Sequence, residues 1–298
     1  MAPLDGRKQW APQLLAEDVQ RYLAERAKDR SKPFFLYYAP ILPHANNEAD
    51  ESSPLGHGME APADPEFASR DWPAVEKAFA SAMKFVDRDV GAVMAQLKAL
   101  NLDEHTIVMY SSDNGPHQEG GHKAAFFQSS GGLTGTKRDL TEGGVRVPFI
   151  ARWPARIPAG KKNDATVLTA VDLLPTFCAA AGVSPPADAQ GDGENMLPAL
   201  TDTAFRRTRP VFWRISGNDK LPDYWPDLAV REGDWKLVTT FDGRRVELHD
   251  LGSDRSEEAS RDRSREQPAL VARLTKLALA WQATLPTKAD PACTAPPK

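Results

Sequence analysis

A short apolar run that ends in a glycine-rich polar turn constrains this sequence more than any other feature. The run is TIVMY at residues 106–110, and the turn is SSDNGPHQEGGH at residues 111–122. β-branched and aromatic residues favour a buried strand. The turn crowds carboxylate, amide and imidazole groups together, and a buried carboxylate must be paired with or bound to something. We therefore expect the turn to hold a metal ion and an anionic ligand.

The order of the predicted elements indicates an α/β fold. Apolar residues recur at helical spacing in residues 13–30, 74–100 and 169–182,. Residues 33–40, 105–112 and 147–153 have the composition of short strands,. Alternating strands and helices are typical of a sheet covered by helices. Because residues 33–40 and 106–112 are apolar on both faces, we expect both strands to be fully buried.

The pattern changes near residue 203. Short runs at 210–215, 228–232, 234–240 and 244–251 predict a small antiparallel sheet, with turn signals between the strands,. Apolar residues at helical spacing after Pro268 predict a final helix,. We therefore predict two domains, a larger one over residues 1–202 and an α+β subdomain over residues 203–298.

Composition excludes several classes of protein. The formal net charge is −4 and the calculated pI is about 5.9, so there is no general attraction for nucleic acid,. No apolar run approaches the roughly 20 residues that a membrane span requires. The first ten residues lack an apolar core, so we expect no signal peptide in this chain,.

Three groups of residues are candidates for chemistry. Asp113 and Asn114 supply hard oxygen ligands suited to Ca²⁺ or Mg²⁺, although DNG is also a common turn sequence,. Lys137, in a glycine-rich loop, could hold a tetrahedral anion or could be an ordinary solvated lysine,. His117 and His122 flank Glu119 and could contact a substrate or simply be exposed loop histidines,.

Several segments together resemble the arylsulfatase-type enzymes of the alkaline-phosphatase superfamily. They are KPFFLYYAPILPHANNE, DRDVGAVMAQLKAL, TIVMYSSDNGPHQEGGH, GTKRDLTEGGVRVPFIARWP and AVREGDWKLV followed by ELHDL, and they occur in the order of the family. The resemblance implies a mixed sheet sandwiched by helices, alkaline-phosphatase-like, with a small C-terminal antiparallel sheet and helix. It implies that Asp113 and Asn114 are half of a divalent-metal site, for Ca²⁺ rather than Mg²⁺. It also implies that Lys137 binds a sulfate oxygen, and that His44 contacts the ester and helps to protonate the leaving group.

One family feature is absent from the sequence. Sulfatases cleave with a formylglycine made from the Cys or Ser of a C-x-P-x-R or S-x-P-x-R motif, and neither motif occurs in these 298 residues. The resemblance also begins well inside the usual catalytic domain. We therefore expect this chain to correspond to the C-terminal part of a sulfatase. Complete members of the family are expected in the periplasm or outside the cell.

The leading hypothesis is a sulfuric ester hydrolase that acts on a small-molecule or carbohydrate sulfate ester. A non-catalytic, anion-binding protein on the same scaffold is the alternative, and a phosphoryl hydrolase or transferase of the same superfamily is a third. The loops that would select a sugar or an aryl group vary freely, so the particular ester and the oligomeric state do not follow from the sequence.

Overall fold

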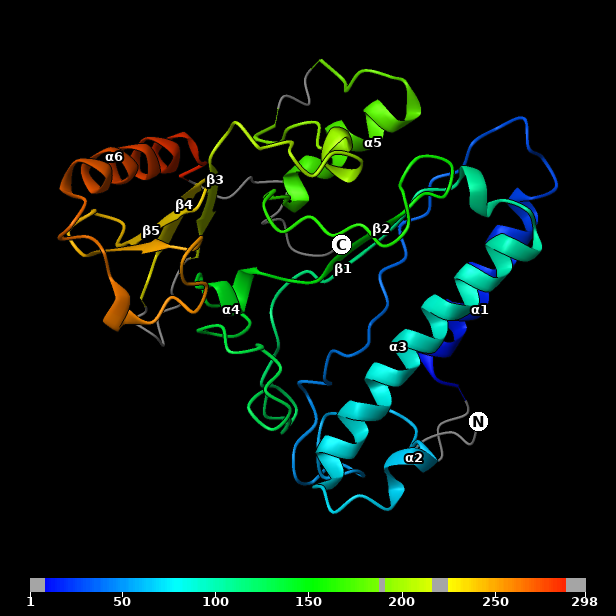
Figure 1. Cartoon of the computed structure of the whole chain (residues 1–298). Coiled ribbons are helices and arrows are strands. Elements are labelled where there is room, and N and C mark those ends of the chain that lie inside the picture. Colours follow the sequence, from blue (N-terminus) through cyan, green and yellow to red (C-terminus); the bar gives the residue numbers. More distant parts are fainter. Residues whose placement is uncertain (1–8, 188–190, 216–224, 288–298) are drawn as a thin grey trace. The chain divides into compact units, whose positions relative to one another are not determined.

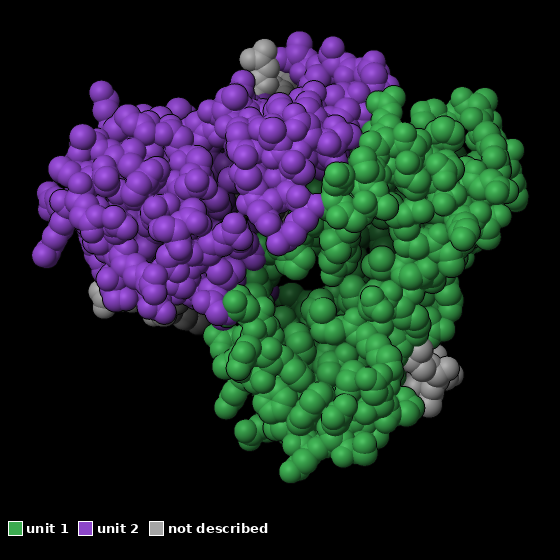
Figure 2. All heavy atoms as spheres, in the orientation of Figure 1, with its two compact units in different colours: residues 1–131, 147–161 green, residues 132–146, 162–298 purple. Residues whose placement is uncertain are grey.

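The computed structural model describes residues 9–187, 191–215 and 225–287. These residues form two compact units, each of which is described by itself (Figure 1). Unit 1 comprises residues 1–131 and 147–161, and unit 2 comprises residues 132–146 and 162–298 (Figure 2). The stretch 132–146 thus packs with the C-terminal part of the chain, although unit 1 precedes and follows it in sequence.

Two long helices dominate unit 1. Helix α1 runs over Ala11–Arg26 and helix α3 over Ala74–Ala99, close to the ranges predicted from helical spacing. They lie side by side (Figure 1). Leu23 of α1 and Leu97 of α3 are almost fully buried in one hydrophobic cluster. The short helix α2, Pro65–Ala68, precedes α3, and the side chain of Asp64 caps its first turn.

The sheet of unit 1 is a single antiparallel pair within the described residues. Strand β1, Val108–Ser111, pairs with β2, Phe149–Arg152, so that Ser111 lies opposite Phe149. Both strands were predicted from composition. Strand β1 ends immediately before the polar turn, as the sequence indicates, but its residues are only partly buried. The expectation of full burial on both faces is therefore wrong for this strand.

The predicted strand over residues 33–40 is also wrong. The burial of its side chains alternates, as it does along extended backbone, but the segment is not paired as a strand,. Phe34, Leu36 and Tyr38 pack against the α1–α3 cluster, whereas Phe35 and Tyr37 are 68% and 81% exposed. The alternation follows from extended backbone, which directs successive side chains to opposite sides. One side has a core to pack on, and the other has no covering element among the described residues of this chain.

Unit 2 contains the predicted antiparallel sheet. Its strands are β3 (Val211–Arg214), β4 (Leu228–Glu232), β5 (Trp235–Thr239) and β6 (Val246–Asp250), paired in that order. Glu232 pairs with Trp235, which leaves a two-residue turn. Gly233 in that turn has φ of +60°, a conformation that costs glycine little.

Both faces of this sheet are covered. Helix α6, Pro268–Thr284, packs Leu274 and Ala278 on one face, against Val230, Leu237 and Leu248 (Figure 1). The other face holds Ala229 and Val238, which contact Leu140 and Val145 of the stretch 132–146. The short helix α4, Glu142–Val145, belongs to that stretch. The loop with the candidate lysine is therefore packed on the C-terminal sheet.

The remaining helix of unit 2 is α5, Leu173–Ala181, which follows a 3-10 turn over Ala170–Asp172 and ends at Gly182 with φ of +72°. It was predicted as one helix over residues 169–182. The domain boundary at residue 203 stays a prediction, because two compact units in space need not be units that fold independently. No helix in the described ranges is both long and apolar enough to cross a membrane.

Candidate functional site

His44 and Glu119 come together in unit 1, 75 positions apart in the sequence. The Nε2 atom of His44 lies 3.4 Å from Oε2 of Glu119. The Nδ1 atom of the same ring lies 2.7 Å from the carbonyl oxygen of Ala45. The His44 side chain is 46% exposed, whereas that of Glu119 is 11% exposed. A substrate could therefore reach the imidazole, and the carboxylate behind it fixes the orientation of the ring.

His117 lies next to this pair. Its ring stacks with that of His44, with centroids 6.1 Å apart. Its Nδ1 atom accepts the backbone N–H of Glu119 at 3.1 Å, so Nε2 carries the proton and donates to the carbonyl of Pro43 at 3.0 Å,. Burial lowers the pKa of His117, and the bond to Pro43 offsets this only in part. A neutral His117 thus joins the turn to the segment that carries His44.

His122 is buried deeper than the sequence suggests. It is 1% exposed and stacks on Phe79 of α3, with centroids 3.7 Å apart. Its Nδ1 atom lies 2.6 Å from Oε2 of Glu76. The other oxygen of Glu76 accepts the backbone N–H of Lys123 at 3.0 Å. His122 therefore anchors the turn to α3 in this structure, and substrate contact by His122 stays an untested prediction.

Asp113 and Asn114 follow directly after β1, but Asp113 is exposed and Asn114 only half-buried. The premise that the turn contains a buried carboxylate in need of a partner is therefore wrong for Asp113. Asn114 donates from its amide nitrogen to the carbonyl of Gly115 at 2.9 Å, so its amide oxygen is not the atom used in this bond. The turn thus offers two oxygen groups to a ligand.

These two groups suit a hard cation but do not complete a site. Ca²⁺ takes six to eight oxygen ligands. No group of three or more His, Cys, Asp or Glu side chains in the described ranges is arranged to hold a metal ion. The described residues therefore fit only part of the calcium site that the family resemblance implies, and calcium binding by Asp113 and Asn114 stays a prediction.

Lys137 belongs to unit 2, and the structure places it relative to that unit only. It is half-buried in a tight loop in which Thr136 donates its N–H to the carboxylate of Asp139 at 2.7 Å. Gly143 closes the loop by donating to the carbonyl of Thr134 at 2.7 Å. A Cβ atom on Gly143 would lie 2.1 Å from the carbonyl oxygen of Gly135. Only glycine fits there, which explains part of the EGG motif.

Sequence reasoning missed the residues that hold these loops. Glu76 holds His122, and both Lys236 and Glu257 contact Glu142 beneath the Lys137 loop. The sequence around a fully buried lysine in a strand does not show that the lysine is buried, apart from the alternation of its apolar neighbours. From the sequence, a glutamate in the first turn of a helix is expected only to interact with the positive end of the helix dipole, so nothing marks it as a buried partner.

The comparison with known families assigns the chain. The sequence model of the Sulfatase family matches residues 6–183, which is more than half of the chain. A second family model, described as N-sulphoglucosamine sulphohydrolase, C-terminal, matches residues 135–283. The chain belongs to the sulfatase family.

Curated relatives agree. The chain is 32% identical over 209 residues to N-acetylgalactosamine-6-sulfatase of Canis lupus familiaris, an alignment that covers 65% of this chain and 34% of that protein. It is 30% identical over 239 residues to arylsulfatase A of Bos taurus, covering 78% and 41%. An N-acetylgalactosamine-6-O-sulfatase of Bacteroides thetaiotaomicron is 24% identical over 292 residues, covering 88% and 50%. The chain thus spans between about a third and a half of the length of these relatives.

Solved structures confirm the fold class. The crystal structure of Ps i-CgsB superposes with a TM-score of 0.71 at 26% identity, covering 94% of this chain and 58% of that one. The PsFucS1 sulfatase from Pseudoalteromonas sp. superposes with a TM-score of 0.65 at 22% identity, covering 93% and 54%. The fold is therefore the alkaline-phosphatase-like α/β fold of the sulfatases, with a small C-terminal antiparallel sheet and helix.

Proposed function

We propose that this chain takes part in the hydrolysis of sulfuric esters and supplies the side of the site that faces the leaving group. The observation that carries the proposal is the pairing of His44 with Glu119 beside His117, in a chain of the sulfatase family. Since the chain spans only part of its curated relatives, the proposal concerns the residues that the chain contains.

His44 has the geometry of a proton donor. Both ring nitrogens face oxygen atoms, those of Ala45 and Glu119. A proton on Nδ1 would be donated to the carbonyl of Ala45, and a proton on Nε2 would be attracted by the carboxylate of Glu119,. A proton held at Nε2 and shared with Glu119 can pass to the oxygen of the departing alcohol, because general acids act within hydrogen-bond reach of that atom. Glu119 would orient His44 and stabilise the charged ring until the proton is transferred.

Two further groups would bind the sulfate. The Lys137 ammonium would contact a sulfate oxygen as a point charge. Asp113 and Asn114 would contribute two of the oxygen ligands of a divalent cation, Ca²⁺ in preference to Mg²⁺. A cation bound there supplies charge stabilisation to the sulfate oxygens. The family's nucleophile has no motif in this sequence, so we assign no residue to the attack on sulfur.

We propose a carbohydrate sulfate ester as the substrate class. Relatives from the dog and from Bacteroides thetaiotaomicron are named as sulfatases of N-acetylgalactosamine 6-sulfate groups. One solved structure of Ps i-CgsB is a complex with k-i-k-neocarrahexaose. Another relative, arylsulfatase A, is named for aryl esters, so an aryl sulfate is the second substrate class to examine.

Ligand titration followed by NMR of ¹⁵N-labelled histidine tests the proposal on the full 298-residue chain. N-acetylgalactosamine 6-sulfate should shift the imidazole signals of His44 and His117, whereas N-acetylgalactosamine should not. His249 of unit 2 is the internal reference. His44→Ala should weaken binding by about tenfold or more, which corresponds to a lost charged hydrogen bond of about 1.5 kcal/mol. Equal shifts with both sugars would refute a sulfate site at His44.

A non-catalytic anion-binding role is the second candidate, and the absence of a C-x-P-x-R or S-x-P-x-R motif favours it. The two roles differ in turnover and not in binding. If the in-frame coding sequence upstream of this chain supplies the motif, the longer protein should hydrolyse the ester, and Lys137→Ala should abolish that activity. If the longer protein binds the ester without hydrolysing it, the non-catalytic role is correct.

A further inference from the structure

Unit 2 contains a small cavity whose polar lining is entirely basic. Its volume is about 140 Å³, and four arginines line it, Arg206, Arg207, Arg209 and Arg231. The other lining residues are alanine, valine and glycine, and among the described residues no acidic side chain lines it. We call this cavity the arginine pocket. Arg207 and Arg231 pair with carboxylates of unit 2, whereas Arg206 and Arg209 do not within the part of the chain that the structure describes, so the pocket carries an excess of positive charge that attracts an anion,.

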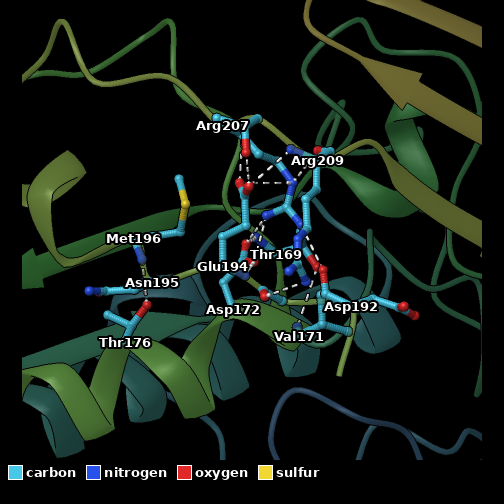
Figure 3. Close-up of polar contacts among 12 residues, drawn as sticks. Thr169, Val171, Asp172, Thr176, Asp192, Glu194, Asn195, Met196, Arg207 and Arg209 are labelled. Carbon is cyan, nitrogen blue, oxygen red and sulfur yellow. Dashed lines mark hydrogen bonds and ion pairs between the residues drawn. The ribbon is translucent and has the colours of Figure 1, made fainter. Parts of the chain in front are cut away.

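Arg207 is rigidly held in the arginine pocket. Its Nη1 atom lies 2.5 Å from each carboxylate oxygen of Asp172 (Figure 3). The Arg207 side chain is 6% exposed and that of Asp172 is fully buried. The same carboxylate accepts the backbone N–H groups of Thr169 and Glu194, both at 2.8 Å. Asp172 therefore neutralises the charge of Arg207 and holds its side chain in a fixed position in the lining of the arginine pocket.

Arg206 and Arg209 have no carboxylate partner. Arg206 donates from Nη1 to the carbonyls of Thr203 and Phe205, at 2.7 and 2.9 Å. Arg209 donates from Nη1 to the carbonyls of Gly191 and Gly193, at the long distances of 3.3 and 3.4 Å. Among the described residues, their Nε and Nη2 groups have no acceptor. Both residues are exposed and line the arginine pocket, so two positive charges with donors still available are accessible to an anion from solvent.

Arg231 lines the arginine pocket from strand β4. Its Nη1 atom lies 3.5 Å from Glu142, and its Nε donates to the carbonyl of Gly233 at 3.0 Å. Glu142 also pairs with Arg146 and Lys236, and Lys236 pairs with Glu257 as well, so two carboxylates serve three cations. Burial lowers the pKa of Arg231, although Glu142 opposes this. A bound anion would compensate the desolvation of this guanidinium.

We propose that the arginine pocket is a binding site for a tetrahedral oxyanion, either a free sulfate or phosphate ion or a sulfate group on a sugar. Guanidinium groups bind such oxygens through pairs of parallel N–H donors. A cavity of about 140 Å³ has room for several waters at about 30 Å³ each. It can therefore hold an anion with four oxygens. The site lies wholly within unit 2 and does not involve His44, Asp113 or Asn114.

Titration of the full chain with sodium sulfate, at ionic strength held constant with sodium chloride, tests the proposal. NMR of the arginine Nε–H groups should show saturable shifts at Arg206 and Arg209. The double variant Arg206→Ala/Arg209→Ala should weaken sulfate binding by tenfold or more. Arg206→Lys/Arg209→Lys keeps both charges but removes the paired donors, and it should weaken binding by less. The lysine variant also keeps the test valid if the alanine variant folds poorly.

Two matched controls separate the arginine pocket from other sulfate sites. Arg244→Ala removes an exposed arginine of unit 2 that pairs with Asp242 and should leave binding unchanged. Lys137→Ala should weaken sulfate binding at the proposed catalytic site only, and it should leave the saturable shifts of the Arg206 and Arg209 Nε–H groups unchanged, because Lys137 does not line the arginine pocket. Loss of binding in Lys137→Ala but not in the arginine double variant would overturn the proposal. The absence of saturable sulfate, phosphate or sugar-sulfate binding in the wild type would overturn it equally.

A second titration distinguishes a free sulfate or phosphate ion from a sulfate group on a sugar as the ligand of the arginine pocket. If N-acetylgalactosamine 6-sulfate binds the arginine pocket at least as tightly as free sulfate, and N-acetylgalactosamine does not bind, the pocket takes sulfated sugars. If only the free ions bind, it takes inorganic sulfate or phosphate. Since this readout is independent of His44 and of turnover, it remains interpretable if the proposed hydrolase function fails.

Discussion

The ammonium of Lys236 lies 3.1 Å from the carboxylate of Glu142, and both side chains are buried. Lys236 also lies 3.1 Å from Glu257. Glu142 begins helix α4, five positions after Lys137, and its backbone N–H donates to the carboxylate of Glu257. This buried cluster joins strand β5 to the Lys137 loop. The C-terminal sheet therefore determines the position of a residue that the sequence assigns to the sulfate.

Lys236→Met should destabilise the chain strongly. The substitution leaves two buried carboxylates without their shared cation, and breaking a buried pair costs about 3–5 kcal/mol. Chemical denaturation monitored by circular dichroism gives the free energy of unfolding. Lys276→Met, which removes an exposed lysine of α6, is the control and should change stability by less than about 0.5 kcal/mol. A similar small effect of Lys236→Met would contradict the importance of the cluster.

Acid should weaken the same cluster. Burial raises the pKa of Glu142, but Lys236, Arg231 and Arg146 together lower it below its ordinary value of 4.5. Since the folded pKa lies below the unfolded one, the stabilisation is present above about pH 4.5 and is lost as the pH falls through the folded pKa. Unfolding free energies measured across this range should fall less steeply in Glu142→Gln than in the wild type. Equal slopes would show that another carboxylate governs the acid response.

Glu76→Ala should cost about 1–3 kcal/mol, because the buried Nδ1 of His122 and the N–H of Lys123 lose their acceptor,. Glu76→Gln keeps an acceptor oxygen and should cost less. Asp87→Ala, an exposed acid on the same helix, is the control. Thermal unfolding measures all three variants. If Glu76→Ala matches the control, His122 does not depend on Glu76.

The 298-residue chain by itself should not turn over p-nitrophenyl sulfate. The reason is chemical, because no residue in the sequence lies in a motif for the family's nucleophile. Release of p-nitrophenol is followed by absorbance, with Lys137→Ala as the comparison. Turnover by the wild type that disappears in Lys137→Ala would mean that a nucleophile exists which we have not identified.

The exposed apolar side of residues 33–40 should bind the dye ANS. Phe35 and Tyr37 are 68% and 81% exposed, and Ile41 is 50% exposed. Exposed apolar patches of this kind bind hydrophobic partners or cause aggregation. Phe35→Ser/Tyr37→Ser should lower ANS fluorescence by roughly twofold. Val183→Ser removes another exposed apolar side chain, of 60% exposure, and should change it little. Weak ANS fluorescence in the wild type would indicate that this side is covered in solution.

The sequence by itself determined the elements whose signals are local. Alternation and turn residues placed β4 at residues 228–232 without error, and Pro268 marked the start of the final helix. Motif order identified the family. The residue types of the polar turn predict hard-oxygen and imidazole chemistry, which stays a prediction; the structure shows that the rings of His44 and His117 stack.

Only the tertiary structure decided which charges are buried and which apolar side chains are not. Lys236 reads as an ordinary strand lysine, yet it is fully buried with Glu142, 94 positions away. Phe35 and Tyr37 read as core residues, yet they are exposed. Residues 132–146 pack with unit 2 although their neighbours in sequence belong to unit 1. The periodicity of apolar residues shows only which side chains of one segment share a face. Burial depends on which distant segment covers each face, and that is decided when the chain packs.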